Sequence, residues 1–219
     1  KAFFFSRTEN GRSAIYQVTY EEGHWGEALM FFPTQSTYSD ADPAFDRHGN
    51  LYFISNRPRD EADTLADYDI WFVRQSPQGG WSTPENLRVV NSDSSEYYIS
   101  FTDDGTLYFS SSRAGGFGEE DIYFSRAKGE NYEQPENAGA PINSTYSEYD
   151  PFVSRDGNLV IFTSSGRPDS FGKADLYFSC RSDGSWSGPI HFTDRINTDQ
   201  REYCPVITRD GAYFFFSSG

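Results

Sequence analysis

Hydrophobic positions along the chain are gathered in short runs separated by turn residues. The runs are four to eight residues long, are rich in Phe and Tyr, and end at Gly, Asp, Asn, Ser or Pro. Such runs are typical of β-strands, and no long stretch has the apolar spacing of an amphipathic helix. The pattern therefore predicts an all-β protein with almost no helix.

These runs recur in the same order about every 54 residues. The turn glycines Gly49, Gly105, Gly157 and Gly211 are 56, 52 and 54 residues apart. An aromatic strand follows each turn, and a Trp or Tyr comes about ten residues later. A fixed period of this size indicates a repeat architecture, and four strands per repeat make the blade of a β-propeller. We expect a β-propeller of four-stranded antiparallel blades with about four repeats.

The repeats run through residues 1–219 without a linker, which predicts a single domain. Residues 2–7 and 213–217 both match the second strand of a blade, so the chain holds one second strand in excess. Two arrangements fit this count. The chain is a fragment of a larger propeller, or it closes as a small ring in which residues 202–208 complete the blade begun at Ala2, which removes a free sheet edge.

Charge and composition exclude several classes of partner and of protein. The formal net charge of -15 argues against nucleic acid and anionic membranes as partners, because both attract Lys and Arg. No stretch approaches the length of a membrane-spanning helix, and no signal peptide is recognisable, so we expect no membrane insertion. Two cysteines make no disulfide framework, and we expect Cys180 and Cys204 to be free, buried thiols.

One acid stands at the start of each predicted inner strand. Inner strands line the channel of a propeller, so these carboxylates would form a ring at one mouth, suited to a cation or to a partner that carries Lys or Arg. They are the candidate ligand-binding residues Asp40, Glu96, Glu148 and Glu202.

The same acids also fit a purely structural role, which we favour. Each repeat has an Arg after the second strand and most have an Asp before the third, so acids and arginines together would form a network between blades through bidentate bonds. The members of this network are Arg7, Arg57, Arg113, Arg167, Asp69, Asp121 and Asp175.

The sequence predicts no catalytic residue, metal site or cofactor. Asp42, Asp150 and Glu96 are candidates for a glycosidase, but equivalent acids in every repeat leave no distinct catalytic pair. The three histidines lack a metal-ligand spacing. The acidic loop at residues 57–68 is longer than its counterpart at 113–120, and it either binds a cation or partner or is a solvated surface loop.

Several motifs resemble those of the TolB-like, WD-repeat-like β-propellers. They are Asp-Pro-Phe-Val-Ser-Arg-Asp-Gly at residues 150–157, Leu-Tyr-Phe-Ser-Ser-Ser-Arg at 107–113 and Asp-Ile-Tyr at 121–123. The resemblance implies a periplasmic or secreted protein of the bacterial cell envelope. We expect a binding or scaffolding module for a protein, peptide or glycan; the alternative is a carbohydrate-active propeller enzyme, a hydrolase or lyase with channel carboxylates.

Overall fold

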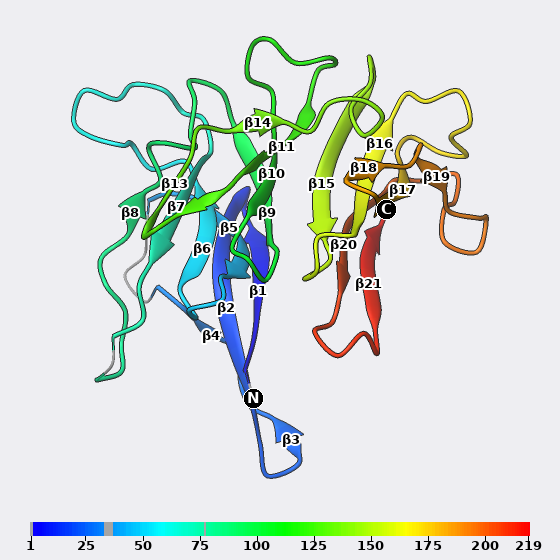
Figure 1. The fold of residues 1–219 in the computed structure, drawn as a ribbon. Coiled ribbons are helices and arrows are strands. Elements are labelled where there is room, and N and C mark those ends of the chain that lie inside the picture. The colour runs from blue at the N-terminus through cyan, green and yellow to red at the C-terminus, as the bar shows by residue number, and fades with distance from the viewer. Residues whose placement is uncertain (1, 33–36, 77) are drawn as a thin grey trace. The chain divides into compact units, whose positions relative to one another are not determined.

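The computed structural model describes residues 2–32, 37–76 and 78–219. These residues form β-strands, turns and loops and contain no helix, which confirms the all-β expectation (Figure 1). No helix able to cross a membrane occurs in this part of the chain. The chain divides into two compact units, Lys1–Leu87 and Arg88–Gly219, and a single domain over the whole length stays a prediction.

The first unit holds two antiparallel blades. In the first blade β1 pairs with β2, and the short β3 and β4 both pair with β2. In the second blade the strand order follows the chain, β5-β6-β7-β8. The bounds are β1 Ala2–Glu9, β2 Arg12–Glu21, β3 His24–Trp25, β4 Leu29–Met30, β5 Asp40–Phe45, β6 Leu51–Ser55, β7 Asp69–Val73 and β8 Glu85–Asn86.

The second unit holds two further blades and a separate two-stranded hairpin. The third blade has the order β9-β10-β11-β14 with a small β12-β13 hairpin, the fourth is β15-β16-β17 with β18 and β19 both on β17, and β20 pairs with β21. The bounds are β9 Glu96–Phe101, β10 Leu107–Ser111, β11 Asp121–Ser125, β12 Ala127–Lys128, β13 Asn131–Tyr132, β14 Glu136–Asn137, β15 Ser147–Val153, β16 Leu159–Ser165, β17 Asp175–Ser182, β18 Ser185–Trp186, β19 Ile190–His191, β20 Glu202–Ile207 and β21 Phe214–Ser218.

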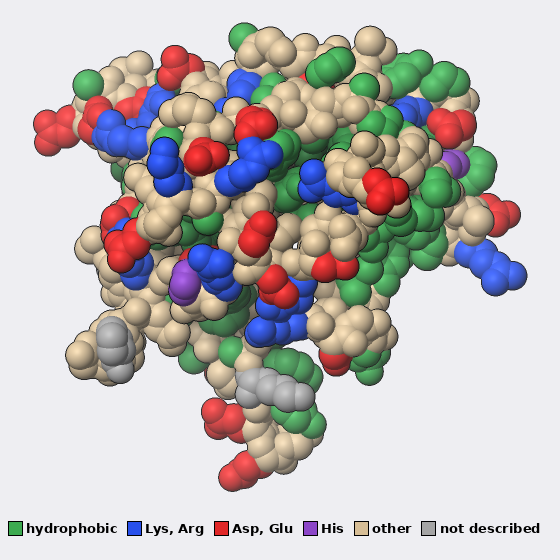
Figure 2. All heavy atoms as spheres, in the orientation of Figure 1, with side chains coloured by type: hydrophobic (Ala, Val, Ile, Leu, Met, Phe, Trp, Pro, Cys, Tyr) green, Lys and Arg blue, Asp and Glu red, His purple; other side chains and the backbone are tan. Residues whose placement is uncertain are grey.

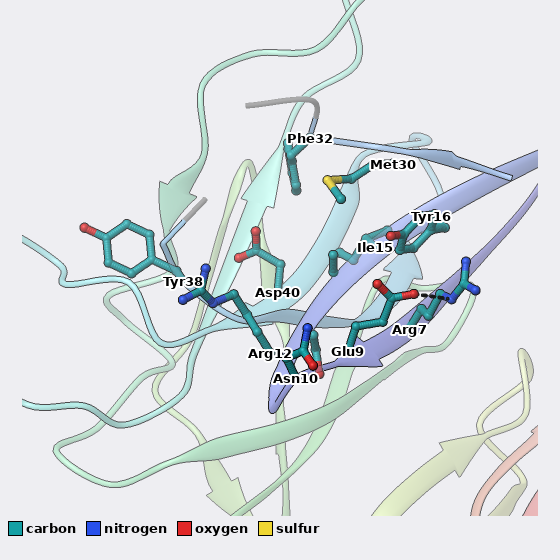
Figure 3. Close-up of a pocket in the computed structure, with 12 residues that line it drawn as sticks. Arg7, Glu9, Asn10, Arg12, Ile15, Tyr16, Met30, Phe32, Tyr38 and Asp40 are labelled. Carbon is teal, nitrogen blue, oxygen red and sulfur yellow. Dashed lines mark ion pairs between the residues drawn. The ribbon is translucent and has the colours of Figure 1, made fainter. Parts of the chain in front are cut away.

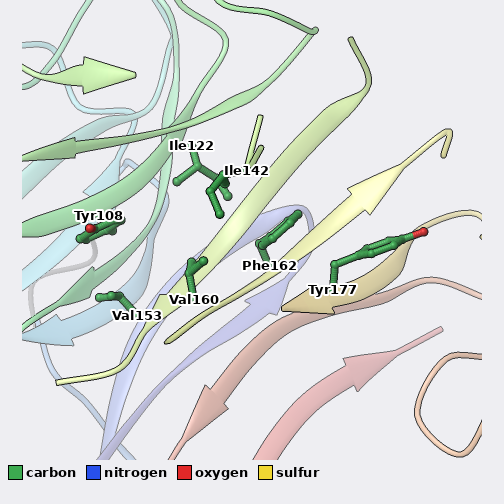
Figure 4. Packing of buried hydrophobic residues seen from close by; sticks show 7 residues of the cluster. All are labelled: Tyr108, Ile122, Ile142, Val153, Val160, Phe162 and Tyr177. Atoms are coloured by element: carbon green, nitrogen blue, oxygen red, sulfur yellow. The ribbon is translucent and has the colours of Figure 1, made fainter. Parts of the chain in front are cut away.

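Each unit has its own apolar core, built from the second and third strands of its blades. In the first unit Leu51 and Phe53 pack with Trp71. In the second unit Tyr108 and Phe162 belong to one buried cluster (Figure 4). The aromatic positions that repeat in sequence therefore lie inside the blades, as expected for strands with both faces covered.

The inner strands share an irregularity. The register of every inner strand with its neighbour shifts at the same place, and the residue there has a left-handed φ between 46° and 53°. These four residues are Asp42, Tyr98, Asp150 and Cys204. Such a backbone costs about 1–3 kcal/mol for a residue other than glycine, so other interactions must stabilise it.

Hydrogen bonds at these bulges join the inner strands of the second unit. Ser100 Oγ on β9 donates to the Pro151 carbonyl on β15 at 2.6 Å. On β20 the Cys204 amide donates to Asp150 Oδ2 at 3.1 Å. The bulges therefore link neighbouring blades through their backbones.

Both cysteines are free, but Cys180 is exposed and Cys204 is half-buried, so neither is the buried thiol that we expected.

The connection between the second and third strands differs between blades. In the third and fourth blades it is a loop whose glycine lies directly against the chain segment before the next inner strand: Gly118 meets Tyr146, and Gly172 meets Gln200. In the first blade it is only the tight turn Asn10–Gly11, with φ of 52° and 75°, an Asn-Gly hairpin turn. The first blade therefore lacks the loop that, in the third and fourth blades, packs against the segment before the next inner strand.

We expect Gly118→Ala to lower the free energy of unfolding by about 1–3 kcal/mol, because the added Cβ would overlap the Tyr146 carbonyl and force the loop to shift. Gly188→Ala is the matched control, since nothing lies within 4 Å of a Cβ at that position. Urea unfolding measures both variants. Equal stabilities of the two would show that the loop does not pack as described.

Candidate functional site

A buried carboxylate lies at the start of each inner strand. Glu96 has 0% exposure and accepts four hydrogen bonds. Its Oε1 receives the hydroxyls of Ser92 and Ser111 at 2.6 and 2.8 Å and Nη2 of Arg113 at 2.9 Å. Its Oε2 receives the Ser92 amide at 3.1 Å. Since a buried charge is costly unless it is paired and hydrogen-bonded, this arrangement stabilises the blade.

The same arrangement recurs in the other blades. Glu148 accepts the amide and hydroxyl of Ser144, the hydroxyl of Ser164 and Nη2 of Arg167 at 2.7 Å. In the first unit Asp40 accepts Nη2 of Arg57 at 2.6 Å.

Glu202 has the same kind of partners without the arginine. It accepts the amide and hydroxyl of Thr198 and the hydroxyl of Ser218. Among the described residues no arginine forms an ion pair with it. The hydroxyl and amide donors are therefore common to the three acids of the second unit, and the arginine is an addition in two of them.

The arginine and the acid of a pair belong to the same blade. Each pair in the second unit uses a single nitrogen, and that nitrogen also donates to a carbonyl of the segment leading into the blade: Arg113 to Val90 at 2.7 Å and Arg167 to Ile142 at 3.3 Å. The Arg113 guanidinium lies over the rings of Phe109 and Tyr123. The expected bidentate network between blades is thus replaced by a clamp within one blade that holds the incoming chain.

Sequence reasoning missed the residues that connect this clamp to the preceding blade. Asn143 accepts the Ile122 amide on β11 and donates to the Ile122 carbonyl, while the next residue, Ser144, binds Glu148. Asn197 and Thr198 repeat this arrangement with Leu176 and Glu202. The sequence does contain a signal for these residues. At positions 91, 143 and 197 an Asn followed by Ser or Thr stands five residues before the glutamate.

The repeated aspartates before the third strand form a separate network. Asp121 accepts the amides of Phe117 and Gly118 and the side chain of Asn137. Asp175 does the same in its loop, with His191 Nε2 at 2.7 Å in place of the asparagine. These acids therefore fix the loop between the second and third strands and do not pair with Arg113 or Arg167.

The first unit departs from this pattern at two sites. Asp69 lies 3.6 Å from Arg59 and accepts Asn86 Nδ2. Arg7 is not the structural equivalent of Arg57, because it pairs in register with Ala14, at the position where Ser55 pairs with Asp69. Its ion-pair partner is Glu9 on the same strand, at 3.0 Å, with both side chains more than half exposed.

The long acidic loop of the second blade is partly neutralised from within. Asp63 accepts the backbone amide and Nε of Arg59, and these hydrogen bonds lower the pKa of Asp63 to about 2. No group of three or more His, Cys, Asp or Glu residues able to hold a metal ion occurs in the described part of the chain. Acidic and basic side chains are also interspersed on the face drawn in Figure 2.

A pocket of about 380 Å³ lies in the first unit, next to the Asn10–Gly11 turn. It is lined by residues of β1, β2 and the segment leading into β5, among them Arg7, Arg12, Tyr38 and Asp40 (Figure 3). In Figure 3 Arg7 lies with Glu9 and Tyr16 on one side, and the guanidinium of Arg12 extends toward Tyr38 on the other. Its volume is in the range of small-molecule sites.

Solved structures identify the fold as that of a β-propeller. A structure assigned as TolB from Agrobacterium tumefaciens matches with a TM-score of 0.57 at 18% identity, over 100% of this chain and 70% of that chain. A thermostable family-43 glycoside hydrolase matches with a TM-score of 0.53 at 16% identity, over 88% of this chain and 72% of that chain. No protein-family model and no curated protein gives a significant match. At these identities the likeness concerns the fold alone.

We expect Arg113→Ala to destabilise the protein by about 3 kcal/mol, because it leaves the buried Glu96 carboxylate without its cation. Arg126→Ala is the matched control: Arg126 pairs with Glu136, but both side chains are about half exposed, and loss of such a pair costs about 1 kcal/mol or less. Denaturant unfolding compares the two variants. An unchanged stability of Arg113→Ala would contradict the clamp.

The pKa of Glu96 is raised because its carboxyl is buried, with opposing but smaller effects from Ser92 and Arg113. A raised pKa means that the folded state binds the proton more tightly, so this contribution to stability is lost as the pH rises. We expect the stability of the wild type, relative to Glu96→Gln, to fall as the pH increases from the ordinary value of 4.5 through the raised pKa. Urea unfolding across this range measures the difference, and a flat or rising difference would contradict it.

Proposed function

We propose that the chain is a non-catalytic binding or scaffolding β-propeller of the bacterial cell envelope, acting in the periplasm or outside the cell. Its partner is a protein, a peptide or a glycan. One observation supports the non-catalytic role: the repeated acids Asp40, Glu96, Glu148 and Glu202 are at most 3% exposed and accept hydrogen bonds from the protein itself. Carboxylates held in this way do not reach a substrate proton, as general acid–base catalysis requires.

The side chains that contact the partner are those that remain available near these acids. We place the partner at the mouth of the channel, nearest to the four acids. Because their oxygens are occupied, contacts with the partner come from neighbouring side chains that differ between repeats. The bulge residues are among them, since this inner-strand position carries Asp42, Tyr98, Asp150 or Cys204.

The envelope location rests on the resemblance to TolB-like propellers. The likeness to the structure assigned as TolB supports the shared fold and is consistent with that location. The low pI of about 4.5 agrees with a protein or peptide partner that carries basic groups, whereas an acidic ligand needs a local site with positive charge.

A carbohydrate-active enzyme is the second candidate. One observation favours it: Asp42 and Asp150 are half-buried on inner strands with left-handed backbone, and strained residues are concentrated at functional sites. Asp150 accepts the Cys204 amide, a structural use of the same carboxylate. The likeness to a family-43 glycoside hydrolase adds only a shared fold.

A panel of envelope glycans, peptides and aryl glycosides distinguishes the two functions. We expect one class of ligand to raise the melting temperature, because binding to the folded state stabilises it by mass action, without release of any product. Thermal unfolding and chromatography of the incubated ligand are the two measurements. Release of a sugar or aryl product that Asp150→Asn abolishes would replace the binding function by the enzymatic one.

A further inference from the structure

The pocket of the first unit results from a missing loop. In the second unit the connection between the second and third strands packs on the segment before the next inner strand, where the Glu148 amide donates to the Glu120 carbonyl at 2.9 Å. In the first blade the Asn10–Gly11 turn takes the place of this loop, and within the described residues 37–39 of the corresponding segment Ser39 Oγ accepts the Ser13 amide. The space that a loop fills elsewhere is therefore open, with a volume of about 380 Å³.

The charges around this pocket favour an anion. Asp40 is already neutralised by Arg57 at 2.6 Å. Arg7 pairs with Glu9, but both are more than half exposed, and such a pair has little stability. Arg12 lines the pocket with an exposed side chain and forms no ion pair within the described residues. A guanidinium without a carboxylate is a ready partner for one.

The remaining lining favours a ligand with hydroxyl groups and a ring. Tyr38 lines the pocket as an aromatic wall that can cover the C–H face of a ring. Tyr16 also lines it, with its ring stacked on Phe5 and under the Arg7 guanidinium, and each tyrosine carries a hydroxyl. The side chain of Asn10, at the turn, offers both a donor and an acceptor to ligand hydroxyls. A sugar acid offers hydroxyl groups to the polar part of this lining and a ring face to its aromatic part, which a purely apolar acid such as a fatty acid does not combine.

We propose that this pocket binds a sugar carrying a carboxylate, such as a uronic acid residue of a glycan, with Arg12 as the partner of the carboxylate. The proposal rests on the binding function proposed above, assigns the ligand to this pocket, which Asp40 alone of the four acids lines, and specifies it as an acidic glycan. Arg7 adds to the positive charge, and Glu9 opposes it. Removing the charge of Arg7 should therefore lower the affinity for the ligand, and removing the charge of Glu9 should raise it.

The test is titration of the full chain with sodium glucuronate, with glucose as the neutral match and acetate as the carboxylate without a ring, followed by calorimetry or ligand-observed NMR. We expect glucuronate to bind more tightly than either. Arg12→Gln should weaken glucuronate binding about tenfold or more, because a charge-assisted hydrogen bond is lost. Glu9→Gln should strengthen it, and added salt should weaken it.

Arg195→Gln is the control variant, because Arg195 is an exposed arginine of the second unit that does not line the pocket. It should bind glucuronate like the wild type, and all variants should keep the wild-type melting temperature without ligand. Equal binding of glucose and glucuronate, no glucuronate binding, or an Arg12→Gln affinity equal to that of Arg195→Gln would overturn the acidic-sugar proposal. A neutral glycan or peptide that still raises the melting temperature would leave the general binding function intact, so the two failures are distinguishable. Tighter binding of a peptide through its C-terminal carboxylate would also overturn the proposal.

Discussion

Burial of one carboxylate at the start of each inner strand is the constraint on which the blades of the second unit depend. A buried carboxylate needs several donors, and Glu148 obtains them from the incoming segment at Ser144, from the second strand at Ser164 and from Arg167. These donors come from two separate parts of the chain, the incoming segment and the end of the second strand. The acid thus fixes the point at which the chain enters the blade, and the asparagine before Ser144 fastens the same segment to the preceding blade.

The bulge of each inner strand also fastens neighbouring blades to one another, at the centre of the strand. Because a bulge leaves backbone groups outside the ladder, these groups can bond to a neighbouring strand. The Cys204 amide bonds to Asp150, and the Pro151 carbonyl receives Ser100. The strain of a left-handed φ is therefore offset by bonds between blades, which explains why residues as different as Tyr98 and Cys204 adopt it.

The sequence predicted the fold more completely than the site. Strand positions followed from the aromatic runs, because the runs around Phe53 and Phe109 are buried on both faces and are local in the sequence. The partners of the repeated acids did not, because hydrogen bonding depends on where the chain crosses between blades. Arg7 illustrates the limit: its motif resembles that of Arg57, but Arg7 follows Phe5 by two residues where Arg57 follows Phe53 by four, so Arg7 lies within the ladder opposite Ala14. The pocket was missed for the same reason, since it arises from the absence of a loop.

Repetition also determines where a binding site can arise. An interaction present in every blade, such as the buried acid, is required by the fold and cannot distinguish one face of the protein from another. Specific recognition needs a feature that one blade has and the others lack, because function in such folds is carried by connections on a rigid scaffold. The Asn10–Gly11 turn is such a feature, since it removes packing that Gly118 and Gly172 provide in the other unit. The lost packing affects one blade only: β1 and β2 stay paired from Ala2 to Glu9, and the clamp of the second blade, Asp40 with Arg57, does not involve the turn.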